Sequence, residues 1–462
     1  MFLFYFNGMW KEASLIMNMA KDKKKYRGIS FRKFFKRLFL TTVILMVLVA
    51  AGSFAYYYAT IYKISDEQEG CLALTNATIL VGEELESYSD STILIEDGMI
   101  AEVGDDINIP GTASVKDLDG KTIIPGLIDM HVHLGMPELE EGEEFGMLSF
   151  PKMIADFVRF TPEKRNNFLE HGVTTIRSVG DEHEWIMEFR GLVNDRELEG
   201  PRLYASGSLF TTLKGHPIAT VGTDPHSEVV LHPDTPEEAR INVQQLANDG
   251  VDLIKVVQER GPDDSQLEPI DEDVLQSIVD VAHAHNIPVV GHWGRIDDLE
   301  DLVEAGVDGL EHIGAGAVRD GWDDDLLEEI TEQGISMTPT LHVETLNGNP
   351  EMRSDQLERV KEFHNADGRV LAGSDAGMPG VLFGPSMHEE LELLVESGLS
   401  PKEALQAATS HAADALQSNE FGIIEQGRAA DLVVIDGDPL QKIEDIQNVS
   451  KVFRDGRLVV EN

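Results

Sequence analysis

Between residues 124 and 419, short apolar runs typical of β-strands alternate with helix-like stretches. This alternation predicts βα units around a parallel sheet. One such helix is expected from Thr235 as N-cap, with Pro236 in the first turn and Gly250 as the stop. The strand-like runs are the one around His131, TTIRSV, PRLYASG, DLIKVV, PVVGHW, GLEHIG, ISMTPTL and RVLAGSDA. Eight such units close a barrel, so we expect an α/β fold with a (β/α)8 barrel of the TIM type over 124–419.

Two β-rich pieces flank this segment, at residues 71–123 and 420–462. In the first, Asp97-Gly98 has the composition of a two-residue hairpin turn. The second carries Asp436-Gly437 and Asp455-Gly456 between β-branched runs. We expect the two pieces to form one small β-sandwich domain that is assembled from both ends of the chain.

The uncharged run over residues 38–62 exceeds the roughly 20 residues that cross a bilayer. Lysines and arginines crowd the preceding segment, residues 1–37, which by the positive-inside rule predicts a cytoplasmic N-terminus and an exported body. The alternative is a signal peptide that is cleaved near Ser53 and Ala55, which would release a secreted protein. The long span and the tyrosines at 56–58 favour a retained single-pass transmembrane helix in the cell membrane.

Charge is divided unevenly along the chain. The formal net charge is -46, but residues 1–65 contain 11 lysines and arginines against two acidic residues. The remainder is therefore strongly acidic and would repel nucleic acid and anionic lipid. We expect no nucleic-acid partner, and membrane contact only through the N-terminal helix.

Polar residues occupy the ends of the predicted barrel strands, where barrel enzymes carry their functional groups. His131 and His133 in IPGLIDMHVHLG are separated by one residue, so on a strand both imidazoles point to the same face. The other runs contain or end in Lys255, His292, His312 and Asp375. A single strand histidine is more often a core or surface residue, but this set, on the first, fourth, fifth, sixth and eighth runs, predicts one shared site.

Imidazoles and a carboxylate without a thiolate predict a metal centre. Zn²⁺ fits these donors best, and Mn²⁺, Co²⁺ and Fe²⁺ remain alternatives. Lys255 does not fit this set, because an ammonium group would repel a dication. A salt bridge between Lys255 and a neighbouring acidic residue is the alternative to a role at the metal.

The chain from about residue 71 to its end resembles the amidohydrolase superfamily. Within that superfamily it is similar to the imidazolonepropionase-like group, which includes metal-dependent prolidases and related dipeptidases. The resemblance is carried by IPGLIDMHVHL, EHGVTTIRSVG, GVDLIKVV, VVGHWG, AGVDGLEHIG, LAGSDAG, GPSMHEELELLVESGLSPKEALQAAT and GRAADLVVIDGDPL.

This resemblance implies two divalent metal ions and a Lys255 that is carboxylated by CO₂, so that its carbamate bridges the ions. It implies that His131, His133 and Asp375 hold one ion and that His292 and His312 hold the other. A hydroxide shared between the ions would attack the substrate carbonyl. Asp375 would take the proton and then deliver it to the departing amine.

Further residues are candidates for the substrate. By resemblance, His216 in TLKGHP is expected beside the substrate as a catalytic residue, and a loop histidine is the alternative. Arg177 is a candidate for binding a substrate carboxylate, or else for a structural ion pair. Trp293 and Arg295 in HWGR stand where the dipeptidases have a tyrosine, and we expect them to set substrate specificity.

The expected function is hydrolysis of a carbon–nitrogen bond in a small amide or peptide, such as a dipeptide or an N-acyl amino acid. Cyclic amides of the imidazolone type and lactones are the alternatives, because the same centre can attack each kind of carbonyl. A non-catalytic, membrane-tethered binding protein would be expected to lack ligands, and none of the expected ones is missing. The resemblance is also compatible with a homo-oligomer.

Overall fold

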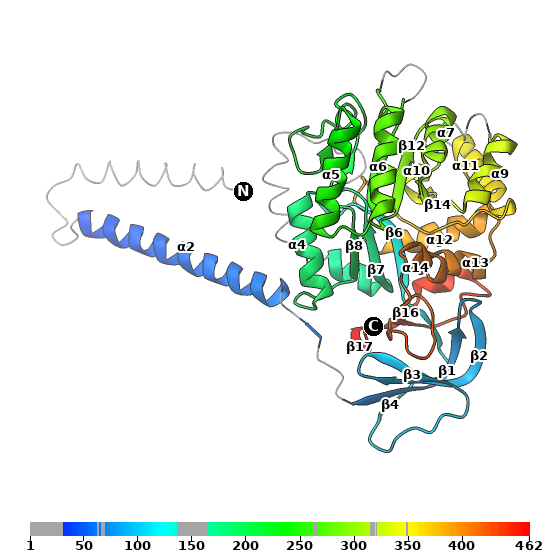
Figure 1. The fold of residues 1–462 in the computed structure, drawn as a ribbon. Coiled ribbons are helices and arrows are strands. Elements are labelled where there is room, and N and C mark those ends of the chain that lie inside the picture. Colours follow the sequence, from blue (N-terminus) through cyan, green and yellow to red (C-terminus); the bar gives the residue numbers. More distant parts are fainter. Residues whose placement is uncertain are drawn as a thin grey trace. The chain divides into compact units, whose positions relative to one another are not determined.

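The computed structural model describes residues 31–61, 64–65, 70–135, 162, 164–261, 267–314, 319, 321–347 and 350–462 (Figure 1). By its internal contacts the chain separates into two units, Met1–Thr60 and Ile61–Asn462. Each unit is described by itself below.

The first unit contains one long apolar helix, α2 (Phe31–Ile61). Its span Lys36–Tyr56 has a mean hydropathy of 2.4 and is long enough to cross a membrane. Two of its few polar side chains are satisfied within the helix, because Thr41 and Thr42 donate to the carbonyls of Arg37 and Leu38. The predicted apolar segment is therefore a helix over the residues described.

Strands from both ends of the second unit form one sheet of mixed direction, in the order β17-β16-β15-β5-β1-β2-β3, with β4 beside β1. They are β1 (Cys71–Val81), β2 (Glu86–Glu96), β3 (Met99–Gly104), β4 (Ser114–Asp117), β5 (Thr122–Pro125), β15 (Leu432–Ile435), β16 (Val449–Arg454) and β17 (Arg457–Glu461). The two ends of the chain meet where β5 runs antiparallel to β15, with Ile123 opposite Val434. The joint sheet agrees with the sequence analysis, while its closure into a sandwich stays a prediction.

Two of the Asp-Gly pairs turn hairpins as expected. Asp97 and Gly98 between β2 and β3 both have positive φ, and so do Asp455 and Gly456 between β16 and β17. Asp436-Gly437 differs, because a longer connection that contains the 3-10 helix η1 (Ile443–Gln447) follows it before β16 begins.

The central part of the chain contains two parallel sheets, ordered β6-β7-β8 and β10-β9-β11-β12-β13-β14. Their strands are β6 (Leu127–Val132), β7 (Val173–Ser178), β8 (Arg202–Ala205), β9 (Leu209–Phe210), β10 (Val230–Leu231), β11 (Ile254–Gln258), β12 (Val289–Trp293), β13 (Gly309–Glu311) and β14 (Ser336–Thr338). Seven of the eight predicted runs are strands. The eighth, around 370–375, makes only isolated bridges, and the two-residue strands β9 and β10 were not predicted.

Helices surround these strands in Figure 1, and from Pro236 to Thr338 single helices alternate with single strands along the chain. They are α4 (His183–Asn194), α5 (Pro236–Asp249), α6 (Glu272–Ala284), α7 (Ile296–Ala305), α9 (Asp324–Gln333), α10 (Leu341–Asn347), α11 (Pro350–Asn365), α12 (Pro385–Ser397), α13 (Pro401–Ala407) and α14 (Ser410–Ala415). The signals read for α5 are confirmed. Thr235 Oγ1 accepts from the backbone of Glu238, and Gly250 ends the helix in the left-handed conformation.

Backbone hydrogen bonds connect the two parallel sheets. On one side, the amide of Asp252 donates to the carbonyl of Ala205 at 3.0 Å. On the other, Leu371 donates to Met337 at 2.8 Å and Met130 donates to Ala372 at 3.0 Å. The segment after residue 370 thus runs between β14 and β6, which brings Asp375 beside the end of β6.

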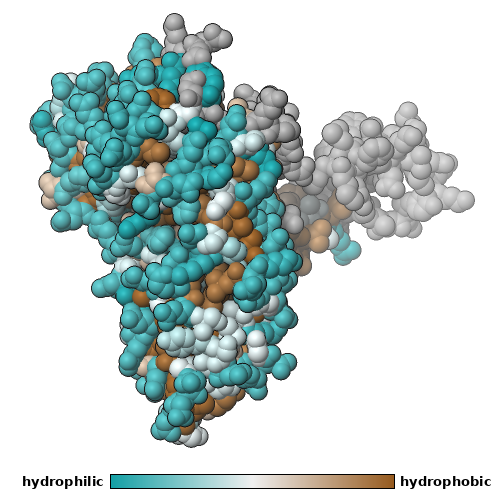
Figure 2. All heavy atoms as spheres, turned by 90° about the vertical axis from the view of Figure 1, so that its right-hand side faces the viewer, coloured by the Kyte–Doolittle hydropathy of each residue, from teal (hydrophilic) through white to brown (hydrophobic). Residues whose placement is uncertain are grey.

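The apolar side chains of the strands are buried beneath the helices, and the mixed sheet has a core cluster of its own. The face drawn in Figure 2 is largely hydrophilic, as the acidic composition leads one to expect. The fold is therefore of the α/β class.

Candidate metal centre

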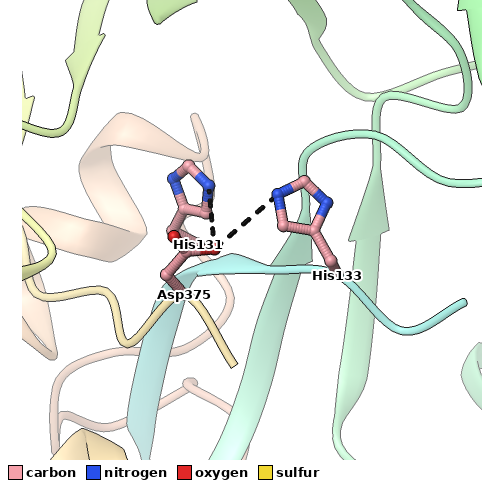
Figure 3. Close-up of side chains that lie close together, drawn as sticks. All are labelled: His131, His133 and Asp375. Carbon is pink, nitrogen blue, oxygen red and sulfur yellow. Dashed lines mark ion pairs between the residues drawn. The ribbon is translucent and has the colours of Figure 1, made fainter. Parts of the chain in front are cut away.

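His131, His133 and Asp375 meet at the carboxyl ends of the parallel strands (Figure 3). The Nε2 atoms of His131 and His133 lie 3.6 and 3.7 Å from Oδ1 of Asp375. One candidate ligand atom from each of the three residues falls within 4.8 Å of the others. The prediction that both histidines of the HxH pair face one point is confirmed.

Two buried atoms of this cluster lack a hydrogen-bond partner among the described residues, Nε2 of His131 and Oδ1 of Asp375. Buried polar atoms are rarely left unsatisfied, because desolvating them without a partner costs free energy. A cation between a carboxylate oxygen and imidazole nitrogens would satisfy both. The three residues can therefore hold a metal ion.

His292 and His312 extend this cluster. The ring centroid of His312 lies 4.6 Å from that of His131 and 4.8 Å from that of His292. Nδ1 of His312 lies 4.0 Å from Oδ2 of Asp375. The structure thus brings the four predicted imidazoles and the carboxylate together in one place.

Oxygen atoms of the protein occupy one nitrogen of each of three imidazoles. Nδ1 of His131 lies 2.5 Å from Oε2 of Glu311, and Nδ1 of His133 lies 3.0 Å from the carbonyl oxygen of Gly180. Nδ1 of His312 lies 2.7 Å from Oγ1 of Thr340. With the proton on Nδ1, the Nε2 lone pair of each ring is left for a metal, the usual arrangement of histidine ligands.

Burial also favours neutral imidazoles. It lowers the pKa of His131 and of His312 well below the usual range, and neighbouring cationic groups such as Lys255 act in the same direction. The pKa of His133 is lowered by burial too, although Asp181 opposes the shift. Only the neutral ring has a free lone pair, so these histidines are ready to bind a cation near neutral pH.

Lys255 on β11 is 3% exposed. Burial lowers the pKa of its amine from 10.5 to about 8, although nearby Glu311 and Asp375 stabilise the charged form. The salt bridge considered as an alternative is not present among the residues that the structure describes. Lys255 is therefore a buried amine that loses its proton far more readily than a surface lysine does.

Burial raises the pKa of Asp375 well above the usual range, and Lys255 opposes that shift only in part. The backbone at this residue is unusual, with φ of 58°, and His312 has φ of 70°. Left-handed conformations of non-glycine residues cost free energy and often occur at functional sites. Asp375 keeps its position through its amide, which donates to the carbonyl of His131 at 2.8 Å.

Glu311, the last residue of β13, is a residue of the centre that is not among those predicted from the sequence. Its two oxygens contact His131 Nδ1 and Arg177 Nη2, each at 2.5 Å, and the side chain is buried. The signal was present in GLEHIG, where an acidic residue stands inside an otherwise apolar strand. The contact with Glu311 is the structural ion pair considered for Arg177, which also donates to the carbonyl of Met130.

The other candidates lie around this centre. The ring of His216 stacks on that of His292, with centroids 5.0 Å apart and planes 7° apart. Arg295 caps α7 and donates to the carbonyl oxygen of Gly261. Trp293 is 1% exposed and packs on Trp322, so its predicted contact with substrate receives no support.

Comparison with known proteins agrees with this geometry. The profile of the amidohydrolase family matches residues 122–459. Ochratoxinase of Aspergillus niger is 26% identical over 86% of this chain and 88% of its own length, and imidazolonepropionase of Nocardia farcinica is 24% identical over 83% and 96%. The crystal structure of a putative prolidase from Bifidobacterium longum superposes with a TM-score of 0.69, at 27% identity over 86% of this chain and 95% of that one.

The match covers the mixed sheet's later strands, every parallel strand and all the residues of the centre, so the predicted resemblance is confirmed. The chain belongs to the amidohydrolase family.

Proposed function

We propose that this protein is a metal-dependent hydrolase that cleaves the carbon–nitrogen bond of a small amide or peptide, such as a dipeptide or an N-acyl amino acid. The observation that carries the proposal is the pair of unsatisfied buried atoms, His131 Nε2 and Asp375 Oδ1, directly beside two further imidazoles. The family membership and the similarity to a putative prolidase support the reaction class.

Two ions fit the donors. His131, His133 and Asp375 would hold one, His292 and His312 the other, and a carboxylated Lys255 would lie between them. Zn²⁺ is the best candidate, because nitrogen and oxygen donors without thiolate suit it. When bound, the ions would lower the pKa of water toward neutrality and polarise the substrate carbonyl.

Carboxylation of Lys255 needs the neutral amine. The nitrogen lone pair adds to the carbon of CO₂, a new N–C bond forms, and one proton is released to solvent. The product is an anion, which suits a place between two cations better than an ammonium does. Burial of Lys255 and its pKa of about 8 support this step.

Asp375 is the proposed acid–base residue. As water adds to the carbonyl carbon, the carboxylate takes the proton from the attacking oxygen. It then gives this proton to the departing nitrogen as the C–N bond breaks, so protons balance over the cycle. His216 would donate a hydrogen bond to the substrate, and the stacking of its ring on that of His292 supports this role.

A cyclic amide is the second candidate substrate, because an imidazolonepropionase is among the relatives. The deciding experiment offers the zinc-loaded full chain, in detergent and bicarbonate, a panel of dipeptides including X-Pro, N-acyl amino acids and cyclic amides. Amine release from linear substrates is the expected result. If only cyclic amides are hydrolysed, the substrate class is cyclic amides and not linear ones. If protein that holds two ions hydrolyses none of these compounds, the proposal is refuted.

Two structural proposals accompany this function. The parallel sheets would close into a single (β/α)8 barrel, which the hydrogen bonds from Asp252 to Ala205 and from Met130 to Ala372 support. Helix α2 would be retained as a single-pass anchor, with residues 1–37 in the cytoplasm and the catalytic body outside the cell. Its length and mean hydropathy support the anchor.

A further inference from the structure

Glu259 contacts a histidine of the centre from outside the predicted ligand set. It directly follows β11, and its Oε2 lies 3.3 Å from Nε2 of His292. The side chains of Glu259 and His292 are only 17% and 19% exposed. Among the described residues, its next ion-pair neighbour is Nδ1 of His216, at 4.0 Å.

In this contact His292 uses the other ring nitrogen from the one that the remaining three imidazoles use for their protein contacts. Their Nδ1 atoms face oxygen atoms of the protein, whereas His292 directs Nε2 to a carboxylate. A proton on Nε2 of His292 leaves the lone pair on Nδ1. We infer that Glu259 is a positioning residue that fixes this ring so that Nδ1 can hold the second ion, an inference that rests on the proposed two-ion centre. Carboxylates beside metal-binding histidines commonly have this effect.

The local backbone leaves room for this carboxylate. A Cβ atom at position 294 would lie 2.9 Å from Cγ of Glu259, closer than such atoms approach. Gly294 follows Trp293 at the end of β12, two residues after His292. The absence of a side chain there is what lets Glu259 lie against the end of β12.

Ion pairs hold the segment that carries Glu259. The guanidinium of Arg260 lies 2.6 Å from Asp298 and 2.7 Å from Asp301, both on α7. Arg295 at the start of the same helix donates to the carbonyl of Gly261. Glu259 therefore projects from a fixed segment, so its carboxylate can hold the imidazole in one orientation.

The experiment measures how tightly each ion is held. The full chain in detergent is loaded with Zn²⁺ or Co²⁺, and the metal content is followed during competition with a chelator. The visible spectrum of the cobalt form reports the ligand environment. The variants are Glu259→Ala, Glu259→Gln and Gly294→Ala, and the control is Glu268→Gln, an exposed glutamate paired with Lys214.

We expect Glu259→Ala to hold one of the two ions about 10- to 100-fold more weakly, while the other is retained as in the wild type. Gly294→Ala should weaken the same ion, because it displaces the carboxylate without removing it. The affinity of Glu259→Gln for this ion should lie between those of the wild type and Glu259→Ala, since its amide oxygen still accepts a hydrogen bond from Nε2 of His292. The control should match the wild type.

The outcomes separate the two proposals. If Glu259→Ala and Gly294→Ala hold both ions as tightly as the wild type does, the role of Glu259 is refuted and the proposed function stands. If the wild type itself holds fewer than two ions in bicarbonate, the two-ion centre and the role of Glu259 are both refuted, and the proposed hydrolysis is tested separately by turnover. Glu259→Gln has nearly the size of the native residue, so it reports on the carboxylate even if the alanine variant does not fold.

Discussion

Nδ1 of His131 lies 2.5 Å from Oε2 of Glu311, and both side chains are almost fully buried. The other oxygen of Glu311 pairs with Arg177. One carboxylate thus orients a proposed metal ligand and balances a buried guanidinium, so the centre and the stability of the fold are coupled through Glu311.

Glu311→Gln should lower both the free energy of unfolding and the affinity for the first ion. Without the carboxylate, the charge of Arg177 is left buried and unbalanced, which typically costs about 3–5 kcal/mol. The ring of His131 also loses its charged partner, and the affinity for the first ion should fall about 10- to 100-fold. Chemical unfolding and metal analysis measure the two effects. Glu332→Gln on the exposed surface is the control, and an unchanged free energy of unfolding in Glu311→Gln would contradict the coupling.

Asp375→Asn should remove the proposed proton carrier. The amide cannot take a proton from water or return it to the leaving nitrogen, so kcat should fall by at least about 100-fold. The fold should persist, because the backbone hydrogen bond from Asp375 to His131 does not need the carboxylate. Steady-state kinetics and circular dichroism make the comparison, with exposed Asp355→Asn as control. Near-normal turnover by Asp375→Asn would assign the proton transfer to another group.

Because of Lys255, the free energy of unfolding of the metal-free protein should increase as the pH rises. Its pKa is about 8 in the folded state against 10.5 ordinarily, so between these values the unfolded chain binds more protons than the folded one. The free energy of unfolding therefore increases with pH across this window, by up to about 3 kcal/mol.

The measurement is urea unfolding at pH 8 and pH 10 in buffer free of metal and CO₂, for the wild type and for Lys255→Met. The methionine variant has no amine to titrate, so other groups cancel in the comparison. The wild type should gain stability relative to Lys255→Met on going to pH 10. If the free energy of unfolding changes equally in the two proteins, the pKa of Lys255 is not lowered by folding.

Much of the fold and the centre follows from local patterns. The HxH pair, the strand-end residues and the limits of α5 depend on strand alternation and capping, which a sequence displays directly. The strands β9 and β10 were not predicted, because a strand of two residues is too short to show an alternating pattern. The role of Glu311 was not predicted, because its partners Arg177 and His131 are distant from it in the sequence.

Trp293 illustrates the other limit. Its predicted role in specificity came from the tyrosine that the dipeptidases have near this position, whereas in this chain the ring of Trp293 packs in the core. Asp436-Gly437 resembles the other two Asp-Gly pairs, but a 3-10 helix separates it from β16. The path of the chain after Gly437 depends on packing that this dipeptide does not encode.

Helix α2 should keep the protein in the membrane. Its span Lys36–Tyr56 carries charge only at its basic beginning, so after membrane fractions are washed with alkaline carbonate the chain should remain in the pellet. Val47→Arg near the middle should weaken insertion, because an arginine there costs about 2.5 to 3.5 kcal/mol. Phe39→Arg, close to the basic end, is the matched control and should matter less, since a long side chain there reaches the interface. Recovery of a chain trimmed near residue 55 from the medium would instead identify α2 as a cleaved signal, and the enzyme would then work free of the membrane.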